Sequence, residues 1–288
     1  MKCFYINLDG ATARRENLER SFHSHAAPDW ELVRVPASGP GDVIDTPGPL
    51  TPAEKACWRS HRAAVFASLA CDEDCLIVED DLQFGPRTFQ MLERVRAAEA
   101  TWDLCFTEIG LRVENMMLYA QRYAQYAAAG AVSLNDLSRL KFSTASGYLV
   151  RHASKVKLIR LLDAVASLDR AYDFFLQDLT HSGQLRSIFC FPFITQPGPH
   201  AEASQIQPSV HELRDRMHVS FRRLMHLDRD LDALEPELAQ LEALHGDRGA
   251  ALVGKVFGAL ASDAMRLSAP APTSGGGRPS VASGGSDR

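Results

Sequence analysis

The chain has 288 residues, of which 45% are hydrophobic and 23% charged, a composition typical of a globular protein with a sizeable core. No apolar run approaches the roughly 20 residues that span a bilayer, and Asp9 interrupts the first apolar stretch too early for a secretion signal, so we expect a cytoplasmic protein. The formal charge of −5, from 31 basic and 36 acidic residues, argues against a nucleic-acid partner bound through a basic surface.

Strands and helices alternate along most of the chain. Residues 3–8 form an apolar run that ends at Asp9-Gly10, which predicts a strand and a turn. Thr51 and Glu54 have capping-box spacing, which predicts the start of a helix. Strands are predicted at 3–8, 32–35, 75–78, 102–106, 147–150 and 188–194; helices at 11–22, 51–69, 86–99 and 152–167, with a helix or turn at 172–181. This alternation favours an α/β fold with a mostly parallel sheet covered on both faces.

The character of the chain changes after Pro208. Leucines at three- and four-residue spacing over 231–244 predict charged helices with a packing or oligomer face. Residues 268–288 are rich in Gly, Ser and Pro and cannot bury enough apolar surface to offset their ordering entropy. We therefore expect a main domain over 1–207, a helical accessory segment over 208–267 and a disordered tail over 268–288.

The acidic run Glu79-Asp80-Asp81 is the most informative motif. It follows a strand expected to be buried, and ligands bind at the carboxyl ends of strands in such sheets. In an extended chain Glu79 and Asp81 point the same way, so together they could hold one Mg²⁺ or Mn²⁺ ion shared with substrate phosphates. A solvated turn after a strand is the alternative interpretation.

Basic and polar candidates lie on the neighbouring elements. Ser60 and His61 belong to a helix face of small residues that would turn His61 inward, either as a core histidine or as a donor to a substrate phosphate or hydroxyl. Asn7 ends the first strand, and Arg14 and Arg15 follow one turn into the next helix. Arginine forks match phosphate oxygens, although a solvated helix face is the alternative.

Two further acids, Asp173 and Asp178, lie among aromatic residues. Burial beside aromatic rings raises a carboxyl pKa and suits it to general-base chemistry, although each acid has a structural alternative. The chain contains neither a dinucleotide fingerprint after its first strand nor a Walker loop. Its six cysteines are too sparse for a disulfide scaffold, and we expect reduced thiols.

Taken in order, these features resemble glycosyltransferase family 25, the lipooligosaccharide galactosyltransferase-like family. The resemblance covers roughly residues 3–207. The residues that carry it are Tyr5-Ile6-Asn7-Leu8-Asp9 with Arg14-Arg15, Leu50-Thr51-Pro52-Ala53-Glu54 with Cys57, Ser60 and His61, Leu76-Ile77-Val78-Glu79-Asp80-Asp81, Trp102-Asp103-Leu104, Gly147-Tyr148-Leu149-Val150, and 192–196 with Ser204 and Ile206.

The resemblance implies a GT-A-type, Rossmann-like fold and inverting transfer of a hexose in surface polysaccharide or lipooligosaccharide synthesis. The donor would be a nucleotide sugar, with a UDP-hexose expected, and the acceptor a glycan or lipid-linked glycan. Glu79 and Asp81 would hold Mn²⁺ or Mg²⁺, which stabilises a departing diphosphate. The nucleotide sugar would be bound by Asn7, Leu8, Arg14, Arg15, Ser60, His61 and Asp80.

The resemblance also requires a carboxylate that takes the proton of the acceptor hydroxyl. Asp173 is the first candidate and Asp178 the second. Glu108 is a third, because this chain has Thr107-Glu108-Ile109-Gly110 where the family tends to continue with an apolar stretch and Gly. Peripheral association with the inner membrane and oligomerisation through the C-terminal helices are further expectations. The competing hypothesis is a non-catalytic nucleotide- or glycan-binding protein that retains the fold.

Overall fold

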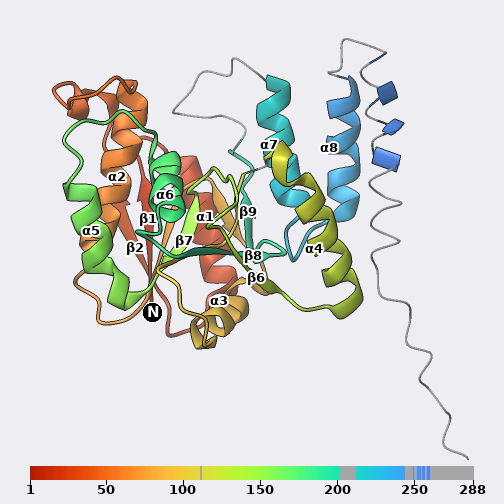
Figure 1. Cartoon of the computed structure of the whole chain (residues 1–288), viewed down its shortest axis with the longest axis horizontal. Helices are drawn as coiled ribbons and strands as arrows, with labels where there is room; N and C mark the ends of the chain where they lie inside the picture. Colours follow the sequence, from red (N-terminus) through yellow and green to blue (C-terminus); the bar gives the residue numbers. More distant parts are fainter. Residues whose placement is uncertain are drawn as a thin grey trace, which may run out of the picture.

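The computed structural model describes residues 1–110, 112–201 and 212–243, together with 249, 252–253, 255–256 and 258–259. Its centre is a 7-stranded sheet in the order β2-β1-β3-β7-β5-β8-β6 (Figure 1). The strands are β1 (Lys2–Asn7), β2 (Glu31–Pro36), β3 (Cys75–Glu79), β5 (Leu104–Phe106), β6 (Ser133–Asp136), β7 (Gly147–Val150) and β8 (Ser187–Phe191). A separate ribbon pairs β4 (Leu82–Phe84) with β9 (Thr195–Pro197).

The direction of the strands matches the expected mostly parallel sheet. β1 is parallel to β2 and β3, and β5 is parallel to β8. β7 is antiparallel to both β3 and β5, and β6 is antiparallel to β8. Hence β2, β1, β3, β5 and β8 point one way and β7 and β6 the other, which confirms the α/β prediction.

Helices cover both faces of the sheet. They are α1 (Thr12–His25), α2 (Pro52–Ser68), α3 (Thr88–Ala97), α4 (Met116–Ala129), α5 (Lys155–Asp163), α6 (Tyr172–His181), α7 (Glu212–Leu224) and α8 (Leu231–Ala243). The buried residues of α2, α5 and α6 pack in one apolar cluster and those of α1 and α3 in another. β1 serves both clusters because successive side chains alternate between the faces of a strand: Phe4 lies in the first cluster and Tyr5 in the second.

Local signals explain why several elements begin where they do. Thr51 Oγ1 accepts from the backbone N–H of Glu54, and the backbone N–H of Thr51 donates to Glu54 Oε2 at 2.9 Å, which confirms the predicted capping box of α2. Residues 112–141, for which no element was predicted, contain α4, which ends at Gly130 with a left-handed φ of 66°, and then β6. The three-residue strands β4 and β9 are too short to produce a periodic pattern, so the sequence did not predict them.

The C-terminal helices pack directly on the sheet domain. Phe221 of α7 contacts the rings of Tyr119 and Phe193, with centroids 5.0 and 5.9 Å apart. The boundary predicted at 208 falls in the gap 202–211, outside the described residues, as does the tail predicted over 268–288. The oligomer face predicted for 231–244 stays a prediction, although Leu234 of α8 is buried within the chain itself. No described helix is both long and apolar enough to cross a membrane.

Candidate active site

The acidic run lies where the sequence predicted it, at the carboxyl end of a central strand. Glu79 is the last residue of β3, and Asp80 and Asp81 form the turn into β4. β1 lies beside β3 and is parallel to it, with Ile6 opposite Glu79. The end of β1 therefore brings Asn7 next to the acidic run.

Asp80 is the anchor of this turn. Its Oδ2 accepts from Asn7 Nδ2 at 2.7 Å and its Oδ1 from Arg14 Nη1 at 3.0 Å. Burial raises the pKa of Asp80, and these two hydrogen bonds oppose the shift. Asn7 is itself held by Arg34, whose Nε donates to Asn7 Oδ1 at 3.0 Å. Because both oxygens of Asp80 are engaged, this carboxylate fixes the backbone of the turn.

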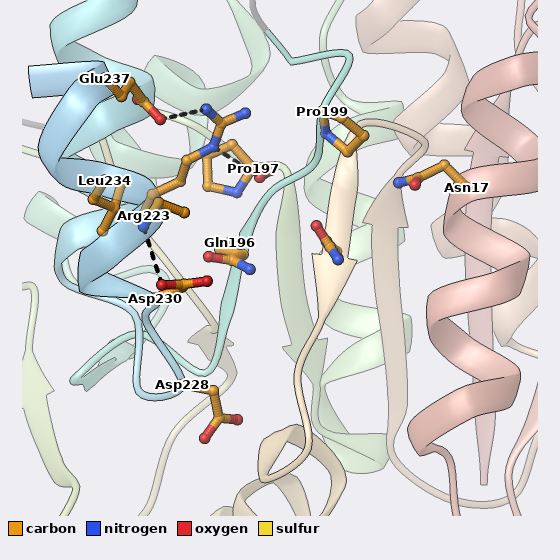
Figure 2. A pocket seen from close by; sticks show the side chains of 11 residues that line it. Asn17, Gln196, Pro197, Pro199, Arg223, Asp228, Asp230, Leu234 and Glu237 are labelled. Atoms are coloured by element: carbon orange, nitrogen blue, oxygen red, sulfur yellow. Dashed lines mark hydrogen bonds and ion pairs between the residues drawn. The ribbon is translucent and has the colours of Figure 1, made fainter.

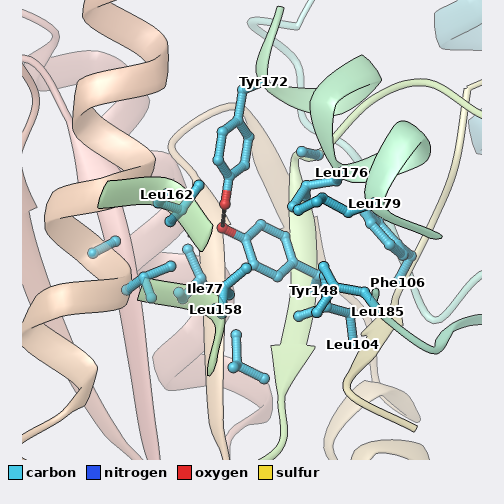
Figure 3. Packing of buried hydrophobic residues seen from close by; sticks show 14 of the residues in the cluster. Ile77, Leu104, Phe106, Tyr148, Leu158, Leu162, Tyr172, Leu176, Leu179 and Leu185 are labelled. Carbon is cyan, nitrogen blue, oxygen red and sulfur yellow. Dashed lines mark hydrogen bonds between the residues drawn. The ribbon is translucent and has the colours of Figure 1, made fainter. Parts of the chain in front are cut away.

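Glu79 is held from the other side by His61 of α2. His61 Nε2 lies 2.9 Å from Glu79 Oε1, and His61 Nδ1 lies 3.1 Å from the Tyr148 hydroxyl. The His61 ring stacks on Tyr172, whose hydroxyl is 2.9 Å from that of Tyr148 (Figure 3). Burial raises the pKa of Glu79, but the hydrogen bond from His61 and nearby positive charges outweigh it, so its pKa is lowered.

Asp81 differs from its neighbours because its carboxylate accepts no hydrogen bond from the described part of the chain. Its Oδ1 is buried and has no hydrogen-bond partner in the described part of the chain, while Oδ2 lies 3.7 Å from Arg14 Nη1. Burial and the charge of Glu79 raise the pKa of Asp81 to about 7, against the effect of Arg222 and Arg14. The carboxylates of Glu79 and Asp81 repel each other, and Asp81 Oδ1 is buried without a partner among the described residues. This pair fits a hard divalent cation, which prefers oxygen ligands.

A buried ion pair completes the acidic cluster, and the sequence did not predict it. Arg222 of α7 donates to Glu108 Oε1 at 2.7 Å, and Ser146 Oγ donates to the same oxygen at 2.5 Å. Glu108 is fully buried. The charge of Arg222 also lowers the pKa values of Glu79 and Asp81. Within a helix of many charged residues, no spacing signal distinguishes Arg222 from the arginines around it.

The three base candidates have different surroundings. Asp173 lies in the first turn of α6, where Oδ2 accepts from the Thr144 N–H and Oδ1 from the Phe174 N–H, both at 2.9 Å. Burial raises the pKa of Asp173, and the charge of Glu79 adds to the shift. Asp178 is 52% exposed and forms an ion pair with Arg170 on the surface. Glu108 is engaged by Arg222, whereas Asp173 has a raised pKa and lies close enough to Glu79 to be affected by its charge.

The other predicted binding residues have local roles. Ser60 Oγ donates to the Ala56 carbonyl at 2.7 Å and accepts from the Ser38 N–H at 2.9 Å, which ties α2 to the loop after β2. The Leu8 carbonyl accepts from the Ala11 N–H in the turn before α1. Neither Leu8 nor Arg15 has a hydrogen bond or ion pair to the acidic run among the described contacts. The structure therefore brings Asn7, Arg14 and His61 together with the acidic run. The binding roles predicted for Leu8, Arg15 and Ser60 stay predictions.

A cavity of about 550 Å³ opens next to this cluster, between α1, the β4–β9 ribbon and the α7–α8 pair (Figure 2). It begins close to the acidic run, because the Gly198 N–H donates to the Asp81 carbonyl at 2.6 Å. Most of its lining groups are amides, carboxylates and one guanidinium, with prolines and Leu234 between them. The lining residues are Asn17, Gln83, Gln196, Pro197, Pro199, Arg223, Asp228, Asp230, Ala233, Leu234 and Glu237.

Comparison with known proteins found similarity only among solved structures. No family model and no curated protein sequence matches the chain. The chain is similar to the apo form of the glycosyltransferase GlyE from Streptococcus pneumoniae TIGR4, with 11% identity and a TM-score of 0.33 over 65% of this chain and 44% of that one. It is also similar to the galactosyltransferase LgtC in complex with donor and acceptor sugar analogs, with 14% identity and a TM-score of 0.34 over 66% of this chain and 73% of that one.

Proposed function

We propose that the protein is an inverting glycosyltransferase of the GT-A type, which moves a hexose from a nucleotide sugar to a glycan acceptor in surface polysaccharide or lipooligosaccharide synthesis. A UDP-hexose is the proposed donor. The observation that carries the proposal is the buried, unpartnered Oδ1 of Asp81 beside Glu79 at the carboxyl end of β3. This is the edge of an α/β sheet where ligands bind.

Glu79 and Asp81 are the residues that would hold a divalent cation, Mn²⁺ or Mg²⁺. Their carboxylate oxygens suit either ion, and a cation would relieve the repulsion that contributes to the raised pKa of Asp81. His61 is hydrogen-bonded to Glu79 Oε1. The other carboxylate oxygen of Glu79, Oε2, would therefore bind the cation together with Asp81 Oδ1. When bound, the cation would stabilise the negative charge that develops on the departing diphosphate.

The surrounding side chains support this role. Arg14 lies against both Asp80 and Asp81, where its guanidinium could pair with phosphate oxygens of the donor. Arg222 adds a positive charge near the cluster, which lowers the pKa values of Glu79 and Asp81. Asp173 is the proposed general base, since its raised pKa favours acceptance of a proton from the acceptor hydroxyl.

Synergy between the cation and the nucleotide tests the proposal. We expect Mn²⁺ and UDP together to raise the melting temperature of the protein by more than the sum of their separate shifts, because the cation bridges carboxylates and diphosphate. Hydrolysis of a panel of nucleotide sugars in the presence of Mn²⁺ then identifies the donor. Purely additive shifts together with no hydrolysis would favour the non-catalytic binding protein instead.

Substitution of the two acids of α6 tests the base. Asp173→Asn should keep UDP binding and lower transfer by about 10²–10⁴-fold, the usual contribution of a general base. Asp178→Asn is the matched control on the same helix, and it should transfer sugar at the wild-type rate because its surface ion pair lies apart from the cluster. Unchanged transfer by Asp173→Asn would remove this residue from the mechanism.

A further inference from the structure

Three potential metal ligands of different chemistry converge beside the acidic run. Cys57 and His61 lie one turn apart on α2, so their side chains share a helix face. One ligand atom from each of Cys57, His61 and Glu79 lies within 4.8 Å of the other two. Ligand atoms bound to one tetrahedral ion at about 2.0–2.3 Å lie roughly 3–4 Å apart. Only small side-chain rotations therefore separate this arrangement from a coordination sphere.

The chemical character of these ligands differs from that of the Glu79–Asp81 pair. A thiolate, an imidazole and a carboxylate form the mixed set that binds Zn²⁺, whereas Mg²⁺ and Mn²⁺ favour oxygen ligands alone. Three protein ligands also leave the fourth tetrahedral position open. The set therefore selects a borderline-soft, thiophilic cation rather than the hard cation proposed for transfer.

His61 is already oriented for such a role. It is 1% exposed, its ring is stacked on Tyr172, and its Nδ1 lies 3.1 Å from the Tyr148 hydroxyl. Metal-bound histidines characteristically make a hydrogen bond through the other ring nitrogen, which fixes the tautomer and the ring plane. In the metal-free protein His61 Nε2–H donates to Glu79 Oε1. A shift of this proton to Nδ1, where Tyr148 would accept it, would leave Nε2 free to bind the metal.

The electrostatic surroundings favour a cation at this position. Burial and the charges of Glu79, Asp173 and Asp81 raise the pKa of Cys57 well above its ordinary value, so the thiol holds its proton in the metal-free protein. The same negative charges attract a divalent ion, and binding would release the thiol proton to solvent. In the same event the imidazole proton of His61 would move from Nε2 to Nδ1, which faces the Tyr148 hydroxyl.

We propose that Cys57, His61 and Glu79 form a binding site for a thiophilic divalent cation of the Zn²⁺ class, which takes Glu79 away from the Glu79–Asp81 pair. The binding part of this inference stands on the three side chains alone. The consequence, inhibition of sugar transfer by the soft cation, rests on the proposed function.

Cobalt(II) is the probe that tests the site, because a Co²⁺–thiolate bond produces a near-ultraviolet charge-transfer band. We expect the full-length protein to bind one Co²⁺ with this band and Zn²⁺ to displace it. Cys57→Ser should lose the band, whereas Cys71→Ser, which changes a cysteine outside the cluster, should keep it. Absence of the band in the wild-type protein, or its persistence in Cys57→Ser, would overturn the proposal.

Two further measurements keep the test decisive if Cys57→Ser does not fold. Zn²⁺ should protect Cys57 of the wild-type protein from alkylation, as measured by peptide mass spectrometry, and unchanged alkylation would contradict the site. Tyr148→Phe retains all three ligands and should weaken Co²⁺ binding by about 10–100-fold, the usual effect of losing an outer partner of a metal ligand. Unchanged Co²⁺ affinity would show that Tyr148 does not position His61 for a metal.

The regulatory consequence has its own readout. Zn²⁺ should abolish the joint stabilisation by Mn²⁺ and UDP in the wild-type protein but not in Cys57→Ser. A protein that binds Co²⁺ through Cys57 yet shows neither this joint stabilisation nor turnover would refute the proposed function and leave the metal site intact. Retained synergy in Zn²⁺-loaded wild-type protein would instead refute the competition.

Discussion

Two aspartates at opposite ends of the strands of one sheet differ in their surroundings. Asp103 lies at the amino end of β5 and Asp81 at the carboxyl end of β3. Asp103 directly precedes β5, and its oxygens accept from Ser154 Oγ at 2.6 Å and from Lys157 Nζ and the Arg186 N–H at 2.8 Å. Burial opposes ionisation of Asp103, but these donors outweigh it and lower its pKa. Asp81 follows β3 with a buried oxygen unpartnered and a pKa raised to about 7.

An aspartate that follows or precedes a strand and is buried is therefore not, by these features alone, a ligand-binding carboxylate. Both oxygens of Asp103 accept hydrogen bonds from neighbouring elements, so this carboxylate fixes the start of β5 and has no unengaged oxygen for a ligand. Asp81 accepts no hydrogen bond from the described residues, and Arg14 and Arg222 compensate its charge only in part. A ligand could supply the rest of the compensation.

Removal of Asp81 should give the largest effect on activity. Asp81→Ala should lower transfer by at least about 10³-fold and abolish Mn²⁺-dependent UDP binding, since a metal-stabilised leaving group is worth several kcal/mol. The free energy of unfolding should stay the same or rise, because a repelled charge is lost. Asp103→Ala should do the reverse, with wild-type turnover per folded molecule and lower stability. Equal activity of the two variants would erase the distinction between the two aspartates.

Removal of Arg222 should give the largest effect on stability. Arg222→Ala leaves the fully buried Glu108 without its cation, and breaking a buried ion pair in this way costs about 3–5 kcal/mol. Urea denaturation measures the loss. The double variant Arg222→Ala/Glu108→Gln should recover much of it, because the stranded charge is gone. No recovery would mean that Arg222 stabilises α7 through packing rather than through Glu108.

The contributions of Asp81 and Asp103 to the free energy of unfolding should change with pH in opposite directions. Between about pH 4 and 7 folded Asp81 holds a proton that the unfolded chain, with an ordinary pKa of 3.8, has released, so its contribution to stability falls as pH rises. Asp103 has a lowered pKa, so its contribution is present above pH 3.8 and is lost as pH falls through its folded value. In urea titrations across pH, Asp81→Asn should flatten the decline toward pH 7, and Asp103→Asn should flatten the loss below pH 4. The same slope in both variants would contradict these assignments.

Loss of a single donor to Asp103 should have the smallest effect. Lys157 is 45% exposed, and Ser154 and the Arg186 N–H remain bonded to Asp103 without it. Lys157→Ala should therefore lower the free energy of unfolding by about 0.2–1 kcal/mol, the usual range for an exposed ion pair. A loss of several kcal/mol in denaturant titration would show that the donors around Asp103 are not redundant.

Local sequence patterns predicted some features of the fold and the site but not the contacts between distant residues. The capping box at Thr51 and the acids after β3 were predictable because their signals are local, within a few residues of the chain. His61 was predicted to turn inward because small residues surround it on its helix face. The bond between Arg222 and Glu108 spans 114 residues, and no local pattern encodes such a pairing. The surroundings of Asp173 likewise include a partner distant in sequence, the Thr144 N–H. Asp178 differs because it pairs on the surface with the nearby Arg170.

Arg222 lies 114 residues after Glu108, so the ion pair can form only late in co-translational folding. Glu108 is synthesised long before its counter-ion, and Phe193 pairs with His226 further toward the C-terminus. Domains tend to fold as units, and a nascent chain that ends before α7 lacks the counter-ion of Glu108 and retains, among the described hydrogen bonds to that carboxylate, only the one from Ser146. A chain terminated there would therefore be less stable than the full-length protein.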